Sequence, residues 1–146
     1  MERPAAPLES TRAIGRLSPG GLWVGFGYRA GTCRIAVGRG DAIRDGAADR
    51  DQLLALAIAY FAEGFDEAPP DLEATQSDLS ALVRRLIEIE RDEARRTQLR
   101  EALDAIDDGL AGDAVAAKLE AARTPGRKLD PVELVARRAG EIAAGD

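Results

Sequence analysis

A long stretch without helix breakers constrains the fold of this chain more than any other feature. Residues 77–110 contain no proline, and Gly109 is their only glycine. Apolar residues recur at intervals of three and four in both halves of the stretch, as on one face of an α-helix. The first series comprises Leu79, Leu82, Val83, Leu86 and Ile89, and the second comprises Leu99, Leu103, Ile106 and Leu110. We therefore expect residues 77–110 to be helical.

A polar segment, residues 90–98, separates the two apolar series, and the second series is one residue out of phase with the first. Two conformations satisfy this pattern. One continuous helix has a solvated middle, whereas a turn near residues 91–97 folds two helices into a hairpin. We favour the continuous helix, because the polar segment lacks the glycine, proline and asparagine typical of turns. The acid-first pair Asp92 and Arg96, four residues apart, also supports a helix.

The polar middle of this long helix is a candidate docking surface for another protein. Arg91, Arg95 and Arg96 lie there, and a helix with apolar ends cannot bury such a middle in its own domain. Complementary charges on two proteins raise the rate and the specificity of their association. We therefore predict that these three arginines bind a protein partner or a second copy of the chain.

The composition indicates one globular domain with a helical core. The chain has 146 residues, of which 45% are hydrophobic, 32% charged and only 4% aromatic. This length is typical of a single domain. Because the core must consist mainly of Leu, Ala, Val and Ile, we expect more helix than strand. Residues 1–10 include Pro4 and Pro7 and little that packs, so we predict a disordered arm there and a domain over residues 11–146.

Alternating apolar residues near the N-terminus predict a β-hairpin. One strand, residues 22–29, alternates in Leu22, Val24, Phe26 and Tyr28, and the next, residues 32–37, alternates in Cys33, Ile35 and Val37. This period is typical of strands with one buried face. The two intervening residues, Ala30 and Gly31, suit a tight turn. With a short strand over residues 11–17, residues 11–40 form a β-hairpin or a three-stranded meander. We expect residues 38–48 to be a loop.

A nearly all-apolar segment after this loop predicts the central helix of the core. Asp49 stands at its start, with Gln52 three residues later as in a capping box. Gly64 follows its last apolar residues. We therefore place a core helix over residues 49–64, in which Leu54, Ile58 and Phe61 are buried.

Two shorter helices are expected near the C-terminus, over residues 113–123 and 130–144. Asp130 followed by Pro131 is a strong signal for the start of the last one. The predicted fold class is α+β and mostly α. An N-terminal β-hairpin or three-stranded meander packs on about four helices, one of them long and charged.

The absence of histidine excludes several kinds of chemistry. A histidine general base, a serine–histidine triad and a histidine metal ligand are all impossible. Cys33 is the only cysteine, so it has no partner for an internal disulfide or a cysteine-rich zinc site. The N-terminal residues do not resemble a secretory signal, and no window approaches the ~18 apolar residues of a membrane span. We therefore expect a cytoplasmic protein with no cofactor, no metal and no membrane contact.

The basic N-terminal region supports an alternative, nucleic-acid binding. Residues 1–40 contain six arginines and two glutamates and so have a net charge of +4. Because the whole chain has a net charge of −6, the remaining residues have a net charge of −10. The segment Gly25-Phe26-Gly27-Tyr28 resembles the core of the aromatic RNP1 motif of RNA-recognition domains, whose aromatic residues stack on bases. Val24, Arg29 and Gly31 depart from that motif, and we do not assign the chain to the family. In this alternative the residues that bind nucleic acid or a phosphate are Phe26, Tyr28, Arg29, Arg34 and Arg39.

These observations lead to one preferred function and two alternatives. We expect a non-catalytic accessory or adaptor module that binds another protein through the long charged helix and the β-hairpin. The frequent alanine, arginine, glycine and aspartate are typical of a bacterial or phage genome rich in GC. The alternatives are a nucleic-acid-binding regulator that uses the basic hairpin, and a small enzyme subunit that uses carboxylates and arginines.

Overall fold

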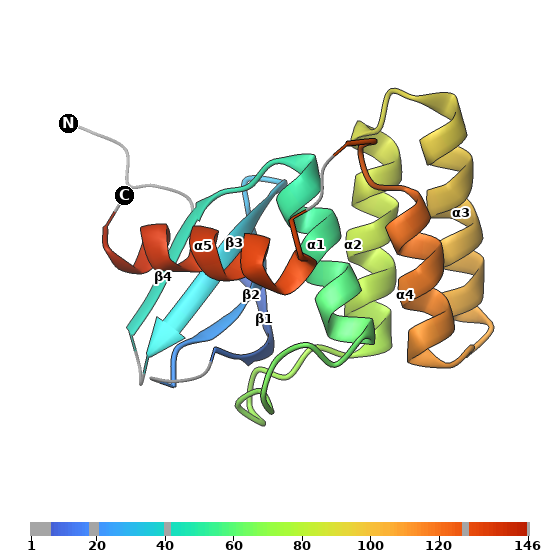
Figure 1. Ribbon diagram of the computed structural model, residues 1–146. Coiled ribbons are helices and arrows are strands. Elements are labelled where there is room, and N and C mark those ends of the chain that lie inside the picture. The colour runs from blue at the N-terminus through green and yellow to red at the C-terminus, as the bar shows by residue number, and fades with distance from the viewer. Residues whose placement is uncertain (1–6, 18–20, 40–41, 127–128, 146) are drawn as a thin grey trace.

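The protein has an α+β fold, in which a four-stranded antiparallel sheet precedes five helices (Figure 1). The computed structural model describes residues 7–17, 21–39, 42–126 and 129–145. The strands are β1 (Glu9–Arg16), β2 (Trp23–Arg29), β3 (Thr32–Arg39) and β4 (Ala42–Ala47), paired in the order β1-β2-β3-β4. The helices are α1 (Arg50–Phe61), α2 (Gln76–Ile89), α3 (Glu93–Asp107), α4 (Gly112–Ala121) and α5 (Pro131–Ala143).

The predicted β-hairpin is confirmed as β2 and β3, with Arg29 opposite Thr32 at the turn. Ala30 and Gly31 both have positive φ, 51° and 81°, as a tight two-residue turn requires. The predicted first strand is β1, which begins at Glu9. Of the arm expected over residues 1–10, residues 1–6 lie outside the described part of the chain.

The structure contains a fourth strand, β4, where the sequence indicated a loop. Its six residues, AIRDGA, include only one large apolar side chain, Ile43, and that side chain is 46% exposed. The strand therefore lacks the alternation that reveals a buried face. Pairing with β3, from Arg34–Ala47 to Arg39–Ala42, defines β4 through tertiary structure instead.

The main core lies between one face of the sheet and the helices. Side chains of the alternating series in β2 and β3, such as Phe26 and Ile35, point into it. α5 lies across this face and contacts β3 and β4, while α1 packs against α2, α4 and α5 (Figure 1). The predicted core helix is α1, with its capping box from Asp49 to Gln52. Its Leu54, Ile58 and Phe61 are all buried, as predicted.

A smaller apolar cluster covers the other face of the sheet. It consists of the buried residues Ala13, Trp23, Ala36 and Ala68, with Leu8 and Leu72 packed against them. The linker between α1 and α2 supplies part of this cover. Its backbone bonds to β1, since Ala13 donates to the Leu72 carbonyl and Ala74 donates to the Ala13 carbonyl. The linker is thus held against β1 on one side and the end of α1 on the other.

The continuous long helix favoured from the sequence is wrong. The alternative of two helices in a hairpin is correct, although the break lies at residues 90–92 rather than near residues 91–97. α2 ends at Ile89 and α3 begins at Glu93, and the two helices lie side by side (Figure 1). Glu90 and Asp92 between them have extended backbones, with ψ of 126° and 123°. The break lets the two out-of-phase apolar series face the same core, where Leu86 and Leu99 are both fully buried. Within the described ranges, no helix has the length and apolar character of a membrane span.

Candidate functional site

A pocket of about 560 Å³ opens where the C-terminal end of α1 meets the linker. Ile14 of β1 and Gly112 at the start of α4 contribute to its walls. Its lining combines aromatic and acidic side chains. The aromatic residues are Tyr60, Phe61 and Phe65, and the acidic residues are Glu63, Asp66, Glu67 and Glu73. We call this site the acidic pocket.

The shape of the acidic pocket follows from how α1 ends. Glu63 adopts a positive φ of 53°, and Gly64 donates to the Ala59 carbonyl over 2.9 Å, so the chain reverses directly after the helix. The linker then runs back along β1. On the opposite wall, a Cβ at Gly112 would lie 2.5 Å from the Phe61 carbonyl oxygen. Glycine therefore allows α4 to begin against the end of α1.

All the charged side chains that line the acidic pocket are acidic. Its four acidic residues are exposed, and within the described part of the chain none of their carboxylates has an ion pair. The C-terminal end of α1 adds the negative end of a helix dipole, and the last turn of α1 carries no basic residue. Arg16 reaches the margin, where it donates to the Glu67 carbonyl. Burial, and after it the charges of Glu73 and Asp78, raises the pKa of Tyr60.

A second, more apolar pocket of about 350 Å³ lies on the other side of the same helix end. It shares Ala59 with the acidic pocket, and Ile58, Ala116 and Val132 line it. The acidic residues in its lining are Asp113, Glu120 and Asp130. Glu120 is paired with Arg123, and Asp130 caps α5. This pocket therefore offers mainly apolar surface beside the unpaired carboxylates of the acidic pocket.

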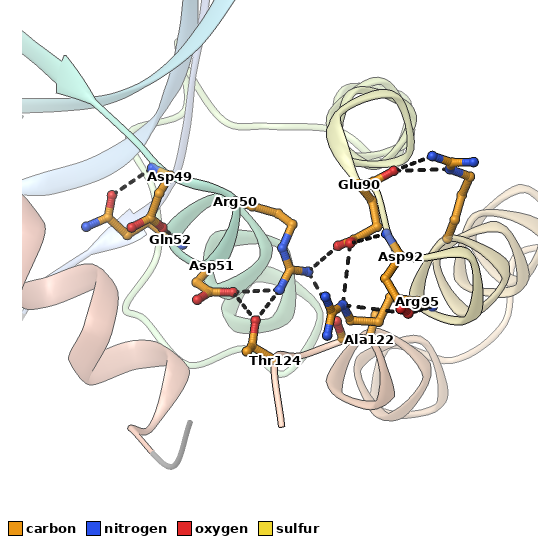
Figure 2. A network of polar contacts seen from close by, with 10 residues as sticks. Asp49, Arg50, Asp51, Gln52, Glu90, Asp92, Arg95, Ala122 and Thr124 are labelled. Atoms are coloured by element: carbon orange, nitrogen blue, oxygen red, sulfur yellow. Dashed lines mark hydrogen bonds and ion pairs between the residues drawn. The ribbon is translucent and has the colours of Figure 1, made fainter. Parts of the chain in front are cut away.

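The three arginines predicted to bind a partner lie at the break between α2 and α3. Arg91 is exposed. Arg95 is half-buried, with its Nε 3.4 Å from Glu90 Oε1 (Figure 2). Arg96 donates to the Glu90 carbonyl oxygen, with Nη2 at 2.5 Å. Two of the three side chains thus bind their own chain at the break, and Arg91 alone among them points to solvent.

The network in Figure 2 is centred on Glu90, whose side chain is only 3% exposed. Its Oε2 lies 2.7 Å from Nη1 of Arg50 in α1. Its Oε1 accepts a hydrogen bond from the backbone N–H of Asp92 over 3.0 Å. Arg50 also donates to the Ala122 carbonyl at the end of α4 and to Thr124. This network joins α1, the α2–α3 break and the end of α4, and its contacts identify it as structural.

The residues of the nucleic-acid alternative are divided between the two faces of the sheet. Phe26 is 1% exposed in the main core, where it cannot stack on a base. Tyr28 lies on the same face, edge-to-face with the Phe26 ring. Arg29 and Arg34 are on the other face, where both bind Asp45, over 2.6 Å and 2.5 Å. Arg39 is exposed at the end of β3.

Cys33 does not have the environment of a nucleophile. It is buried and forms a side-chain hydrogen bond with Tyr28, and burial raises the pKa of its thiol to about 11. Arg85 is the nearby cation that acts to lower this pKa. Among the described residues, no three His, Cys, Asp or Glu side chains are arranged to hold a metal ion.

Sequence reasoning missed the acidic pocket because its residues come from a linker. The signal was present in residues 63–73, EGFDEAPPDLE, which combine acidic residues with Phe65 and two prolines. A linker is normally interpreted as solvated, and only the tertiary contacts with β1 and α4 make this one a pocket wall. Comparison with known proteins adds no assignment, since no protein-family model, no curated protein and no solved structure matches the chain.

Proposed function

We propose that this chain is a non-catalytic protein-binding module that holds a cationic segment of its partner in the acidic pocket. The observation that carries the proposal is the pocket itself, which is lined by four unpaired carboxylates and three aromatic side chains. This is the adaptor function expected from the sequence, with a different surface. The continuous charged helix does not form, and Arg95 and Arg96 have partners within the chain.

The lining of the acidic pocket suits arginine or lysine side chains. Carboxylates attract the charged group, and aromatic rings such as Tyr60 bind cations on their faces. The negative end of the α1 dipole contributes to the same attraction. The adjoining pocket, lined by Ile58 and Val132, can take the apolar residues of the same segment. A segment that alternates basic and apolar residues therefore matches both parts of the surface.

Exposed charges set the expected strength of this binding. Each exposed ion pair contributes roughly 0.2–1 kcal/mol and is weakened by salt. Most of the affinity must therefore come from several pairs together with aromatic and apolar contact. We expect weak binding that falls steeply between low and physiological ionic strength.

A fluorescent peptide of alternating arginine and leucine tests the proposal. Its binding to the full chain is measured by fluorescence anisotropy at several salt concentrations, against a glutamate–leucine peptide of the same length. The variant Glu63→Gln/Asp66→Asn removes two charges from the acidic pocket. The control Glu101→Gln/Asp104→Asn removes the same two charges from exposed positions on α3.

The expected result is binding of the basic peptide and not of the acidic one. The pocket variant should bind roughly twofold to thirtyfold more weakly, which corresponds to two lost pairs of about 0.2–1 kcal/mol each. The α3 control should stay close to wild type. Equal loss in both variants would show that only net charge matters, and the absence of binding at low salt would exclude a cationic partner.

A further inference from the structure

Residues 90–92 break a segment whose own preference is helical. Residues 76–107 contain no glycine or proline and are rich in Leu, Ala, Glu and Arg, which are strong helix formers. The chain nevertheless leaves the helix at Glu90 and re-enters it after Asp92. Local preference and tertiary structure therefore oppose each other at this point.

Contacts from outside α2 and α3 hold the break in place. The Glu90 carboxylate is buried against Arg50 of α1, and Arg50 also binds the Ala122 carbonyl at the end of α4 (Figure 2). Within the break, Asp92 caps α3 by accepting from the N–H of Arg95 over 2.9 Å. In an uninterrupted helix Glu90 would lose its bond from the Asp92 N–H, and Asp92 would lose its capping role.

We infer that residues 90–92 are a hinge, and that a second copy of this chain is the partner that fits the open form. In the open form α2 and α3 become one helix of about 48 Å, at about 1.5 Å per residue. α3, α4 and α5, which follow the hinge in the chain, then leave their own α1, α2 and sheet and pack on those of the second copy. The result is an exchanged dimer that keeps the contacts of the monomer, apart from those within residues 90–92.

The phase of the apolar residues explains why the open form needs a second copy. One residue out of phase corresponds to a rotation of about 100° around a helix. On a continuous helix the apolar residues of the second half, such as Leu99 and Ile106, therefore face away from the core bound by Leu82 and Leu86. Both residues of the second half are at most 3% exposed in the closed structure. The matching surface on a second copy can bury them again.

The variant Glu90→Ala/Asp92→Ala tests the hinge. It removes the buried carboxylate and the cap and adds two strong helix formers. We expect size-exclusion chromatography with light scattering to show twice the mass of the wild-type monomer at high micromolar concentration. The control Glu101→Ala/Asp104→Ala removes the same charges from exposed positions of α3 and should remain monomeric.

An intrachain distance separates exchange from ordinary association. Spin labels are placed at Ser77, near the start of α2, and at Asp108, at the end of α3, in a Cys33→Ala background. In the closed form these two helix ends are close together, because Ser80 donates a hydrogen bond to Asp107 over 3.0 Å. On one continuous helix the same positions are about 47 Å apart. Dilution with unlabelled chain restricts the measurement to single molecules. A dimer with the long distance supports the hinge, and a monomer, or a dimer with the short distance, overturns it.

Arg91→Pro gives a second test that does not depend on the folding of the alanine variant. Proline stops a continuous helix, and the extended backbone of Glu90 suits the residue before a proline. Wild type refolded at millimolar concentration should contain a dimer fraction, which Arg91→Pro should reduce at least tenfold. If refolded wild type contains no dimer, or if the proline variant contains as much, the hinge is refuted.

Discussion

Replacing Arg50 by methionine should cost more stability than any substitution of an exposed arginine in this chain. Methionine retains the apolar stem but removes the charge that faces Glu90. Glu90 Oε2 lies 2.7 Å from Arg50 Nη1 and has no hydrogen bond from any described residue. The substitution therefore leaves Oε2 of a carboxylate that is only 3% exposed without its counter-charge. Arg95 and the Asp92 N–H contact Oε1, the other oxygen.

The size of the effect follows from that geometry. Breaking one side of a buried ion pair costs about 3–5 kcal/mol. Because Arg95 remains 3.4 Å from Oε1, we expect the low end, about 3 kcal/mol. For a chain of this size, 1 kcal/mol shifts Tm by about 2–4 °C, so the melting temperature should fall by roughly 6–12 °C.

A double-mutant cycle measures this interaction directly. Urea unfolding followed by circular dichroism, at low micromolar concentration, gives the free energy of unfolding of Arg50→Met, Glu90→Gln and the double variant. The neutral amide that Glu90→Gln introduces in the double variant needs no counter-charge. The decrease in the free energy of unfolding of the double variant should therefore be at least ~1.5 kcal/mol smaller than the sum of the decreases of the two single variants. Additive losses, or an Arg50→Met variant within ~0.5 kcal/mol of wild type, would refute a buried ion pair at the break.

Three further predictions concern the core, the thiol and the sheet. Leu54→Ala should reduce the free energy of unfolding by about 2–5 kcal/mol, because Leu54 is 1% exposed; a melting temperature within a degree of wild type would show that α1 is not the core helix. Burial raises the pKa of the Cys33 thiol from 9.0 to about 11, so the contribution of this group to stability is complete below pH 9 and is lost as the pH rises toward 11. A thiol reagent at pH 8 should label Cys33 only after unfolding. Fast labelling of the folded protein would contradict its burial. The hydrogen bond from Arg29, and then that from Arg34, lowers the pKa of Asp45, so its contribution is present at neutral pH and lost on acidification; Asp45→Asn should flatten the acid side of the stability profile, and an unchanged profile would contradict the pairing.

Local signals in the sequence were sufficient for much of the fold. The Asp49–Gln52 capping box, the Ala30-Gly31 turn and the start of α5 at Asp130 all form as predicted. Each depends on neighbouring residues, so the sequence contains the whole signal. The same holds for the burial of α1, which is apolar on most of its circumference.

Features that depend on distant residues were not predictable in the same way. β4 pairs with the edge of β3, and Glu90 at the break is paired with Arg50, which lies forty positions earlier. The phase shift between the two apolar series was visible, but helix preference and the absence of turn residues outweighed it. The acidic pocket depends on the return of the linker along β1, which no local pattern encodes.

The position of α5 has a consequence for synthesis of the protein on the ribosome. All four strands precede residue 48, yet α5, which packs on β3 and β4, begins at Pro131. At about 5–20 residues per second, translation reaches the end of α5 roughly 5–20 s after β4 has been made. During that interval the side of the sheet that α5 will cover stays accessible to chaperones and to other nascent chains. Slow codons between residues 48 and 131 would lengthen this exposure without changing the finished fold.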